Sequence, residues 1–366
     1  MENFLSLTDQ EIYALAHNVL TDITEKLADG TYKDLNGHLA FAWSTEKKFN
    51  AWAESRTLGD GPPQHKIVLH YELARILYRD AEAFCSFAVD EQTKNLITRS
   101  FGNNATEALP SCFTINDCIH NMFLASLTWV YFHELGHLMQ EHGRVRNCGT
   151  VSKTSTIAEF DAHAANALEG RQAAISHATE LAADFEATTQ CLVASVQHFL
   201  KGPLVDESDG AEVFLGNVYL LTCSLSCIFY RFNAGSPARA DFPVTGSHPN
   251  PIYRLEIAAP HIYEFTEVLL RANEFDANKR HLVSMVKQAA DLGSFFYNYT
   301  RATGTEETIH LFIKGLPQRP EFRSYSQEIL NTWDEIHPEI LAYRHFGFKL
   351  GIMHFTEEYR RVVFSD

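Results

Sequence analysis

One stretch of the sequence, Thr114–Gly143, constrains what the chain can fold into more than any other. It reads TINDCIHNMFLASLTWVYFHELGHLMQEHG and contains HELGH, an HExxH pattern, at residues 133–137. Two histidines four residues apart lie on one face of a helix, so His133 and His137 can direct both imidazoles to one zinc ion. Glu134 follows the first histidine, where its carboxylate can take a proton from an attacking water.

The residues around this motif carry helix start and stop signals. The chain has 18 histidines, so the HExxH pattern alone is weak evidence and its context decides. Thr114 and Asp117 match a capping box, and Gly143 is typical of the residue after a helix end. We therefore predict one continuous helix of about 28 residues that carries HELGH near its C-terminal end.

Composition narrows the class of protein. The chain has 366 residues, of which 45% are hydrophobic and 12% aromatic, enough for a large core in one or two domains. The net charge of −16 without a basic stripe argues against a nucleic-acid partner. Seven cysteines without a CxxC pair do not form a disulfide framework. The first thirty residues lack the pattern of a signal peptide. These features predict a cytoplasmic location.

One apolar segment approaches the length of a membrane span. Val213–Tyr230 contains 18 residues without a charge, near the lower limit for a spanning helix. Gly216, Asn217 and Ser224 interrupt it, and such polar groups are costly in lipid. We predict a core helix behind the site and no membrane partner.

Hydrophobic periodicity predicts a mainly α (α+β) fold. Helices are expected at 8–28 (with a Thr8 and Glu11 cap), 72–87, 175–200, 213–233, 252–273, 276–300 and 322–335, and strands at 66–71 and 95–101. Three regions are expected: 1–62, an N-terminal helical region; 63–300, a zinc metallopeptidase domain; and 301–366, a helical and aromatic region packed on it. The long loop at 144–173 is expected to be a lid or an inhibitory segment over the cleft.

Zinc held by two histidines needs a third protein ligand and a water in a catalytic site. The metzincin pattern is excluded, because Gln140 and Gly143 occupy the positions of its glycine and third histidine. In a continuous helix His142 lies about 140° round from His137. We therefore expect His142 to point away from the metal.

Glu180 is the better candidate for the third ligand. Asp184 follows one helical turn later on the same face, where it can accept the N–H of a ligating imidazole. The alternative is an acidic surface on an alanine-rich helix. Four further residues remain possible ligands, although each is more often a mere neighbour: His177, His163, Glu159 and Asp161.

At this point a resemblance to a known family becomes visible. HELGH, then Glu180-x-x-Ala183-Asp184-x-x-Ala187, then the segment Ser247–Leu255 (SHPNPIYRL) resemble the HExxH, ExxADxxA and HPxxxxR series of gluzincin metallopeptidases. The series is similar to that of HtpX and the CAAX prenyl proteases, and to that of the soluble Lit-type phage-exclusion peptidases. The three motifs come in the family's order.

The resemblance implies a gluzincin-like fold with a HExxH helix, a second helix carrying the glutamate ligand, and a small sheet. It implies one zinc ion per chain, with His133, His137 and Glu180 as ligands. It makes Glu134 the base and Asp184 the residue that supports a ligand. His248 and Arg254 match the histidine and arginine of the last motif.

Peptide hydrolysis builds an oxyanion, which gives His248 or Arg254 a catalytic role as a preorganised donor. The alternative is that His248-Pro249 is simply a turn before a helix. A second His-Pro pair, His337-Pro338, is followed by Arg344 one residue too late for the motif.

The expected activity is that of a zinc metalloendopeptidase acting on a protein or peptide substrate. HtpX-like and CAAX enzymes are embedded in membranes, so their substrates do not carry over, and the Lit-type comparison fits better. The Gly-x-Met-Glu-Asn element of gluzincin aminopeptidases is missing near the site, which favours an endopeptidase. The alternative is a zinc-stabilised, non-catalytic regulator or sensor that binds a protein partner.

Overall fold

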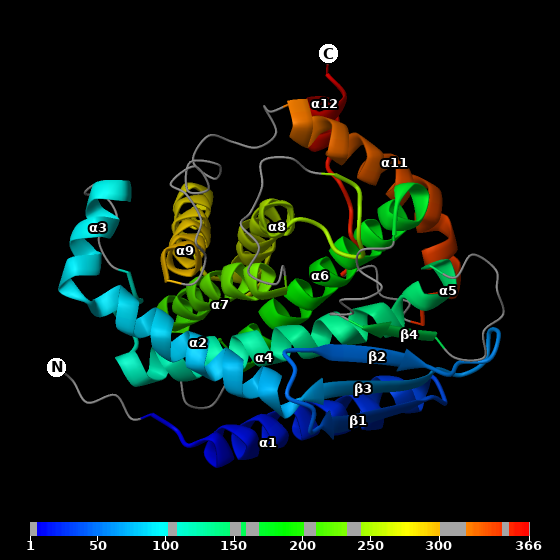
Figure 1. The fold of residues 1–366 in the computed structure, drawn as a ribbon, viewed down its shortest axis with the longest axis horizontal. Coiled ribbons are helices and arrows are strands. Elements are labelled where there is room, and N and C mark those ends of the chain that lie inside the picture. The colour runs from blue at the N-terminus through cyan, green and yellow to red at the C-terminus, as the bar shows by residue number, and fades with distance from the viewer. Residues whose placement is uncertain are drawn as a thin grey trace.

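The computed structural model describes residues 6–101, 108–146, 155–158, 168–200, 210–232, 243–300, 320–345 and 351–365. Over these ranges the fold is mainly helical with one small mixed sheet (Figure 1). The helices are α1 (Asp9–Leu27), η1 (Ala28–Tyr32), α2 (Tyr71–Val89), α3 (Glu91–Phe101), α4 (Ile115–Met139), α5 (His142–Arg146), α6 (Gly170–Phe199), α7 (Gly210–Phe232), α8 (Pro251–Ala272), α9 (Lys279–Thr300), α11 (Pro320–Tyr343) and α12 (Glu357–Phe364). The strands are β1 (His38–Ser44), β2 (Ala51–Ser55), β3 (Gln64–His70) and β4 (Ser155–Ala158).

Two long helices, α4 and α6, cross the middle of the molecule and pack on each other (Figure 1). Helices α7, α8 and α9 pack together on one side, and α7 also contacts α4. The sheet packs on the other side of α4. Near the C-terminus, α11 lies along α6 and α12 packs on α11. The pair α4 and α6 is thus covered by most of the remaining elements.

The sheet has the strand order β1-β3-β2-β4. β1 pairs in parallel with β3, and β2 pairs antiparallel with both β3 and β4. The predicted strand at 66–71 is confirmed as β3, whose Ile67, Val68 and Leu69 are buried. The predicted boundary at residue 62 falls between β2 and β3, which are neighbours in this sheet. Residues 38–55 therefore share a sheet with the start of the predicted metallopeptidase region.

Helix α4 begins as its sequence predicts and ends earlier. The Thr114 side chain accepts from the Asp117 N–H at 3.2 Å, and the Asp117 carboxylate accepts from the Thr114 N–H at 3.1 Å. The predicted continuation to Gly143 is wrong, because α4 stops at Met139. Glu141 then adopts a left-handed conformation, with φ at 48°, which no α-helix continues through. The chain turns there and enters α5 in a new direction.

Several other expectations are settled by the same elements. The Thr8 and Glu11 capping box is present, and the helices predicted at 252–273 and 276–300 are confirmed as α8 and α9. The predicted strand at 95–101 is wrong, because these residues belong to helix α3. The Asp90 carboxylate accepts from the Thr93 N–H at 2.9 Å at the start of that helix. This cap supports a helix despite the β-branched residues.

Among the described helices, α7 is long and apolar enough to cross a membrane. Within its most apolar 18 residues, 89% are buried in the protein. The hydroxyls of Thr222 and Ser226 donate to carbonyl oxygens one turn earlier in the helix, at 2.8 and 3.3 Å. The polar interruptions of the segment are therefore satisfied within a helix that packs in the core.

Candidate metal centre

The structure brings His133, His137 and Glu180 together in the core. The two Nε2 atoms lie 3.0 Å apart, and each lies 3.3 Å from one oxygen of the Glu180 carboxylate. All three residues are at most 1% exposed. Because α4 supplies the histidines and α6 the glutamate, the packing of these two helices sets the distances. The three residues that the sequence spacing grouped together therefore lie close together in the structure.

The distances between the two nitrogens and the carboxylate oxygens are close to those expected around one zinc ion. Four ligands at about 2.0–2.1 Å in a tetrahedron lie roughly 3.3 Å from one another. Burial lowers the pKa of His137 to about 4, so its imidazole is neutral at pH 7 and offers a lone pair. The donor set of two imidazoles and one carboxylate is that of a catalytic zinc site with an open position.

Asp184 lies behind one of the two histidines, as predicted. Its Oδ1 is 3.0 Å from His133 Nδ1, close enough that the carboxylate favours a proton on Nδ1. His133 Nε2, which faces Glu180, then carries the lone pair that a metal needs. The indole of Trp129 stacks on the same imidazole, with ring centroids 5.2 Å apart. His133 is therefore oriented from two sides.

Arg254 binds Asp184 and does not reach toward solvent. Its Nε and Nη2 donate to the two carboxylate oxygens at 2.8 and 2.6 Å. The guanidinium lies over the Phe229 ring, 4.6 Å from its centroid, and the residue is 1% exposed. Its Nη2 is also 4.0 Å from Glu180. This bidentate contact holds Asp184 in a fixed orientation.

His248 lies next to Glu180, in the segment just before α8. Its Nε2 is 3.7 Å from Glu180 Oε2, and its Nδ1 is 2.7 Å from the Ser247 hydroxyl. The side chain is 16% exposed, so it borders both the buried triad and solvent. Among the residues matched to the third motif, His248 is placed where a substrate can meet it.

Arg146, on α5, was missed by sequence reasoning. Its Nη2 donates to Glu180 Oε1 at 2.6 Å and its Nε to the Thr179 hydroxyl at 2.8 Å. Burial alone would raise the pKa of Glu180, yet nearby His248, His137 and Arg146 hold that pKa well below its usual range. No sequence motif marks Arg146. It lies on α5, which follows the end of α4 at Met139, and so its position could not be read from the sequence.

His142 does not join the cluster, as expected, but it lies closer to it than predicted. Its Nδ1 is 2.8 Å from His137 Nδ1, whereas His137 faces Glu180 with Nε2. The expectation assumed a continuous helix, and the turn at Glu141 brings His142 back beside His137. The imidazole is fully buried, and burial lowers its pKa well below the usual value. His142 therefore supports His137 from behind, much as Asp184 supports His133.

The other residues considered from the sequence fall in four groups. Glu134 is completely buried on α4, between the two histidines. His177 does not join the cluster, since its Nδ1 pairs with the Tyr325 hydroxyl at 2.7 Å. His337-Pro338 lies within α11 and not at a helix start. Outside the described residues lie His163, Glu159 and Asp161, and most of the 144–173 loop.

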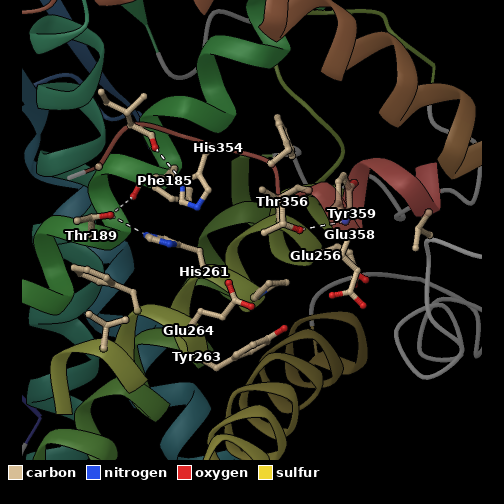
Figure 2. A pocket seen from close by; sticks show the side chains of 18 residues that line it. Phe185, Thr189, Glu256, His261, Tyr263, Glu264, His354, Thr356, Glu358 and Tyr359 are labelled. Atoms are coloured by element: carbon tan, nitrogen blue, oxygen red, sulfur yellow. Dashed lines mark hydrogen bonds between the residues drawn. The ribbon is translucent and has the colours of Figure 1, made fainter. Parts of the chain in front are cut away.

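A cavity of about 690 Å³ lies elsewhere on α6 (Figure 2). Phe185 and Thr189 of α6 form one wall, and His261, His354 and Tyr359 belong to the others. No residue of the metal cluster lines it. Among the described residues that contact Glu180, His248 and Arg146 are partly exposed, at 16% and 18%. We therefore place the approach to the cluster on their side.

Comparison with protein-family models, with curated proteins and with solved structures gives no match for this chain. The class of protein is therefore argued from the geometry of the cluster and its surroundings.

Proposed function

We propose that the chain is a zinc-dependent endopeptidase that hydrolyses peptide bonds of a protein substrate in the cytoplasm. The observation that carries this proposal is the convergence of His133 Nε2, His137 Nε2 and the Glu180 carboxylate. The nitrogens lie 3.0 Å apart and each lies 3.3 Å from a different carboxylate oxygen, and the helix that supplies the histidines also carries Glu134. A zinc ion held by these three side chains supplies a Lewis acid that polarises the scissile carbonyl and lowers the pKa of a bound water.

In the proposed reaction Glu134 takes the proton from the attacking water and passes it to the leaving amine. A general base has to sit near the metal without coordinating it, and Glu134 is the HELGH residue between the ligands. A site built only to hold a metal has no use for a carboxylate at that position.

His248 supplies the donor for the oxyanion in this proposal. It lies at the rim of the cluster, where a substrate carbonyl meets the protein, and it is 3.7 Å from Glu180. Arg254 was matched to the same motif, but its guanidinium is engaged by Asp184. We assign Arg254 the task of positioning Asp184, and through it His133.

The test compares wild type with Glu134→Gln. Cleavage products are mapped by mass spectrometry after expression in cells, and the identified substrate is then used with purified protein. The variant keeps the size of the side chain and removes the basic carboxylate. It should retain zinc and thermal stability and lose at least ~10²-fold in rate.

Glu256→Gln is a matched control, since Glu256 is a partly buried carboxyl that lines the cavity of Figure 2, away from His133, His137 and Glu180. It should cleave as wild type does. If Glu134→Gln leaves every product and cellular effect unchanged, the peptidase proposal fails. The chain is then the zinc-stabilised regulator considered from its sequence.

A further inference from the structure

A second cluster of side chains that could bind a metal lies just beyond the C-terminal end of α4. His65 on β3, Glu141 after α4 and His345 after α11 converge on one point. His65 Nε2 is 3.2 Å and His345 Nε2 2.8 Å from Glu141 Oε1. His65 and Glu141 are at most 2% exposed. The cluster shares no residue with the first one, and no sequence motif marks it.

The surroundings of His65 allow the tautomer that a metal requires. The Tyr32 hydroxyl lies 2.8 Å from His65 Nδ1 and 3.2 Å from the Met139 sulfur. When the Tyr32 hydrogen points to the sulfur, the phenol oxygen accepts from His65 Nδ1–H. His65 Nε2, which faces Glu141, then carries the lone pair.

The backbone of Glu141 is held in an unfavourable conformation. Its φ of 48° is unfavourable for a residue with a side chain and persists only where the surroundings stabilise it. The Ser55 hydroxyl donates to the same carboxylate at 3.2–3.3 Å. Three elements distant in sequence thus direct polar atoms at one carboxylate oxygen.

We propose that His65, Glu141 and His345 form a second metal site, which takes a divalent transition ion such as Zn²⁺. Two imidazoles and one carboxylate select such an ion over Ca²⁺ or Mg²⁺, which prefer oxygen ligands. The Thr57 hydroxyl, 3.3 Å from His65 Nε2, borders the fourth position. The His345 side chain is 12% exposed, which gives the ion a path of entry.

The role of this ion is structural. It joins β3, the end of α4 and the end of α11 at one point, where the His345 N–H also donates to the Met139 carbonyl at 3.0 Å. His137 lies one turn earlier on α4, so the second ion steadies the end of the helix that carries a catalytic ligand. The proposal stands on its own residues and does not depend on the peptidase activity.

The test counts metal ions in full-length protein purified without a histidine tag and reconstituted with Zn²⁺. Wild type should hold about two equivalents per chain, and His345→Gln about one. His133→Gln should also hold about one, and the double variant His133→Gln/His345→Gln none. His337→Gln, a partly buried histidine on α11 outside both clusters, should keep two.

A measurement on the wild-type protein does not depend on whether the variants fold. Anomalous diffraction at the zinc edge of reconstituted crystals should show one peak at His133, His137 and Glu180 and another at His65, Glu141 and His345. A single peak at the first cluster, or two equivalents retained in folded His345→Gln, would show that the second cluster is a hydrogen-bonded network only.

Discussion

Asp184 and Arg254 form a pair of side chains that has a counterpart elsewhere in the molecule. Arg254 donates to Asp184 at 2.8 and 2.6 Å, and Arg231 donates to Asp80 at the same two distances. Both aspartates are nearly buried, at 3% and 4% exposed. Two features distinguish the pairs: the Arg231 side chain is 20% exposed whereas that of Arg254 is 1% exposed, and Asp184 also touches His133. The contact with His133 is the feature that bears on metal binding.

Asp184→Asn is expected to weaken zinc affinity by roughly 10 to 100-fold, because the neutral amide no longer favours a proton on His133 Nδ1. Both Asp184→Asn and Asp80→Asn should lower stability, since each leaves an arginine that is at most 20% exposed without its carboxylate. Asp80→Asn should keep zinc affinity. Competition with a chelator of known affinity and urea unfolding measure the two effects. Equal zinc affinity in both variants would assign Asp184 to the fold alone.

Glu186 predicts a pH dependence of stability. Burial raises its pKa to about 7, although Arg344 and the Gln140 amide, which donates at 2.5 Å, oppose the shift. The folded state therefore holds a proton that the unfolded chain releases above its ordinary pKa of 4.5. Between about pH 4.5 and 7 this group lowers the stability as pH rises, by at most about 1.4 kcal/mol per unit.

Glu186→Gln has no proton to lose, so its stability relative to wild type should increase from pH 5 to pH 7. Urea unfolding at the two pH values measures the change. Glu335→Gln is the control, because Glu335 is an exposed partner of Arg171 whose pKa is lowered by that contact. Its difference from wild type should stay constant over this range. A constant difference for Glu186→Gln as well would show that Glu186 is ionised at pH 5.

At the scale of helices, the contact between α4 and α6 sets the geometry of the metal cluster. A Cβ at Gly136, inside HELGH, would lie 3.3 Å from the Ala183 Cα and 3.4 Å from its carbonyl oxygen. These are backbone atoms, which yield only if the helices move apart by a few tenths of an ångström. Metal ligands tolerate deviations of about 0.2 Å, so such a shift matters to zinc.

Gly136→Ala should therefore weaken zinc binding and gain no stability. Alanine alone favours a helix over glycine by up to about 1 kcal/mol, and close packing opposes this gain. Gly30→Ala is the control, because a Cβ at Gly30, within η1, meets nothing within 4 Å. It should be neutral or stabilising with unchanged zinc affinity. Tighter zinc binding in Gly136→Ala would mean that α4 and α6 are free to adjust.

Local signals in the sequence predicted those elements whose ends are fixed by neighbouring residues. The capping boxes at Thr8 and Thr114 are present because each uses side chains three residues apart. The end of α4 was missed, since Glu141 is held by His65 and His345, far away in the sequence. Strands β1 and β2 were missed for a similar reason, because their pairing with β3 is a tertiary property.

The same distinction between local signals and tertiary contacts applies to the candidate site. His133, His137, Glu180 and Asp184 were found because helical spacing places each pair on one face. Arg146 could not be found, because it reaches Glu180 only after the chain turns at residue 141.

At the scale of the whole molecule, the packing of α7 distinguishes a core helix from a membrane span. It packs against α4, α8 and α9, and its most apolar window is 89% buried. We expect the protein to stay in the supernatant when cells are fractionated without detergent, since the apolar face of α7 is already covered. A protein found wholly in the membrane pellet, and released only by detergent, would contradict this assignment. A known cytoplasmic protein and a known membrane protein in the same lysate are the controls.

The contact between Glu141 and His345 joins residues 204 positions apart, at 2.8 Å. During synthesis the chain emerges from its N-terminus, so every residue assigned to the catalytic cluster has appeared once Arg254 has been made. The end of α4 still lacks its last partner at that time. The second cluster is therefore completed last, after every residue of the first cluster has been made, and His345 is the residue that completes it.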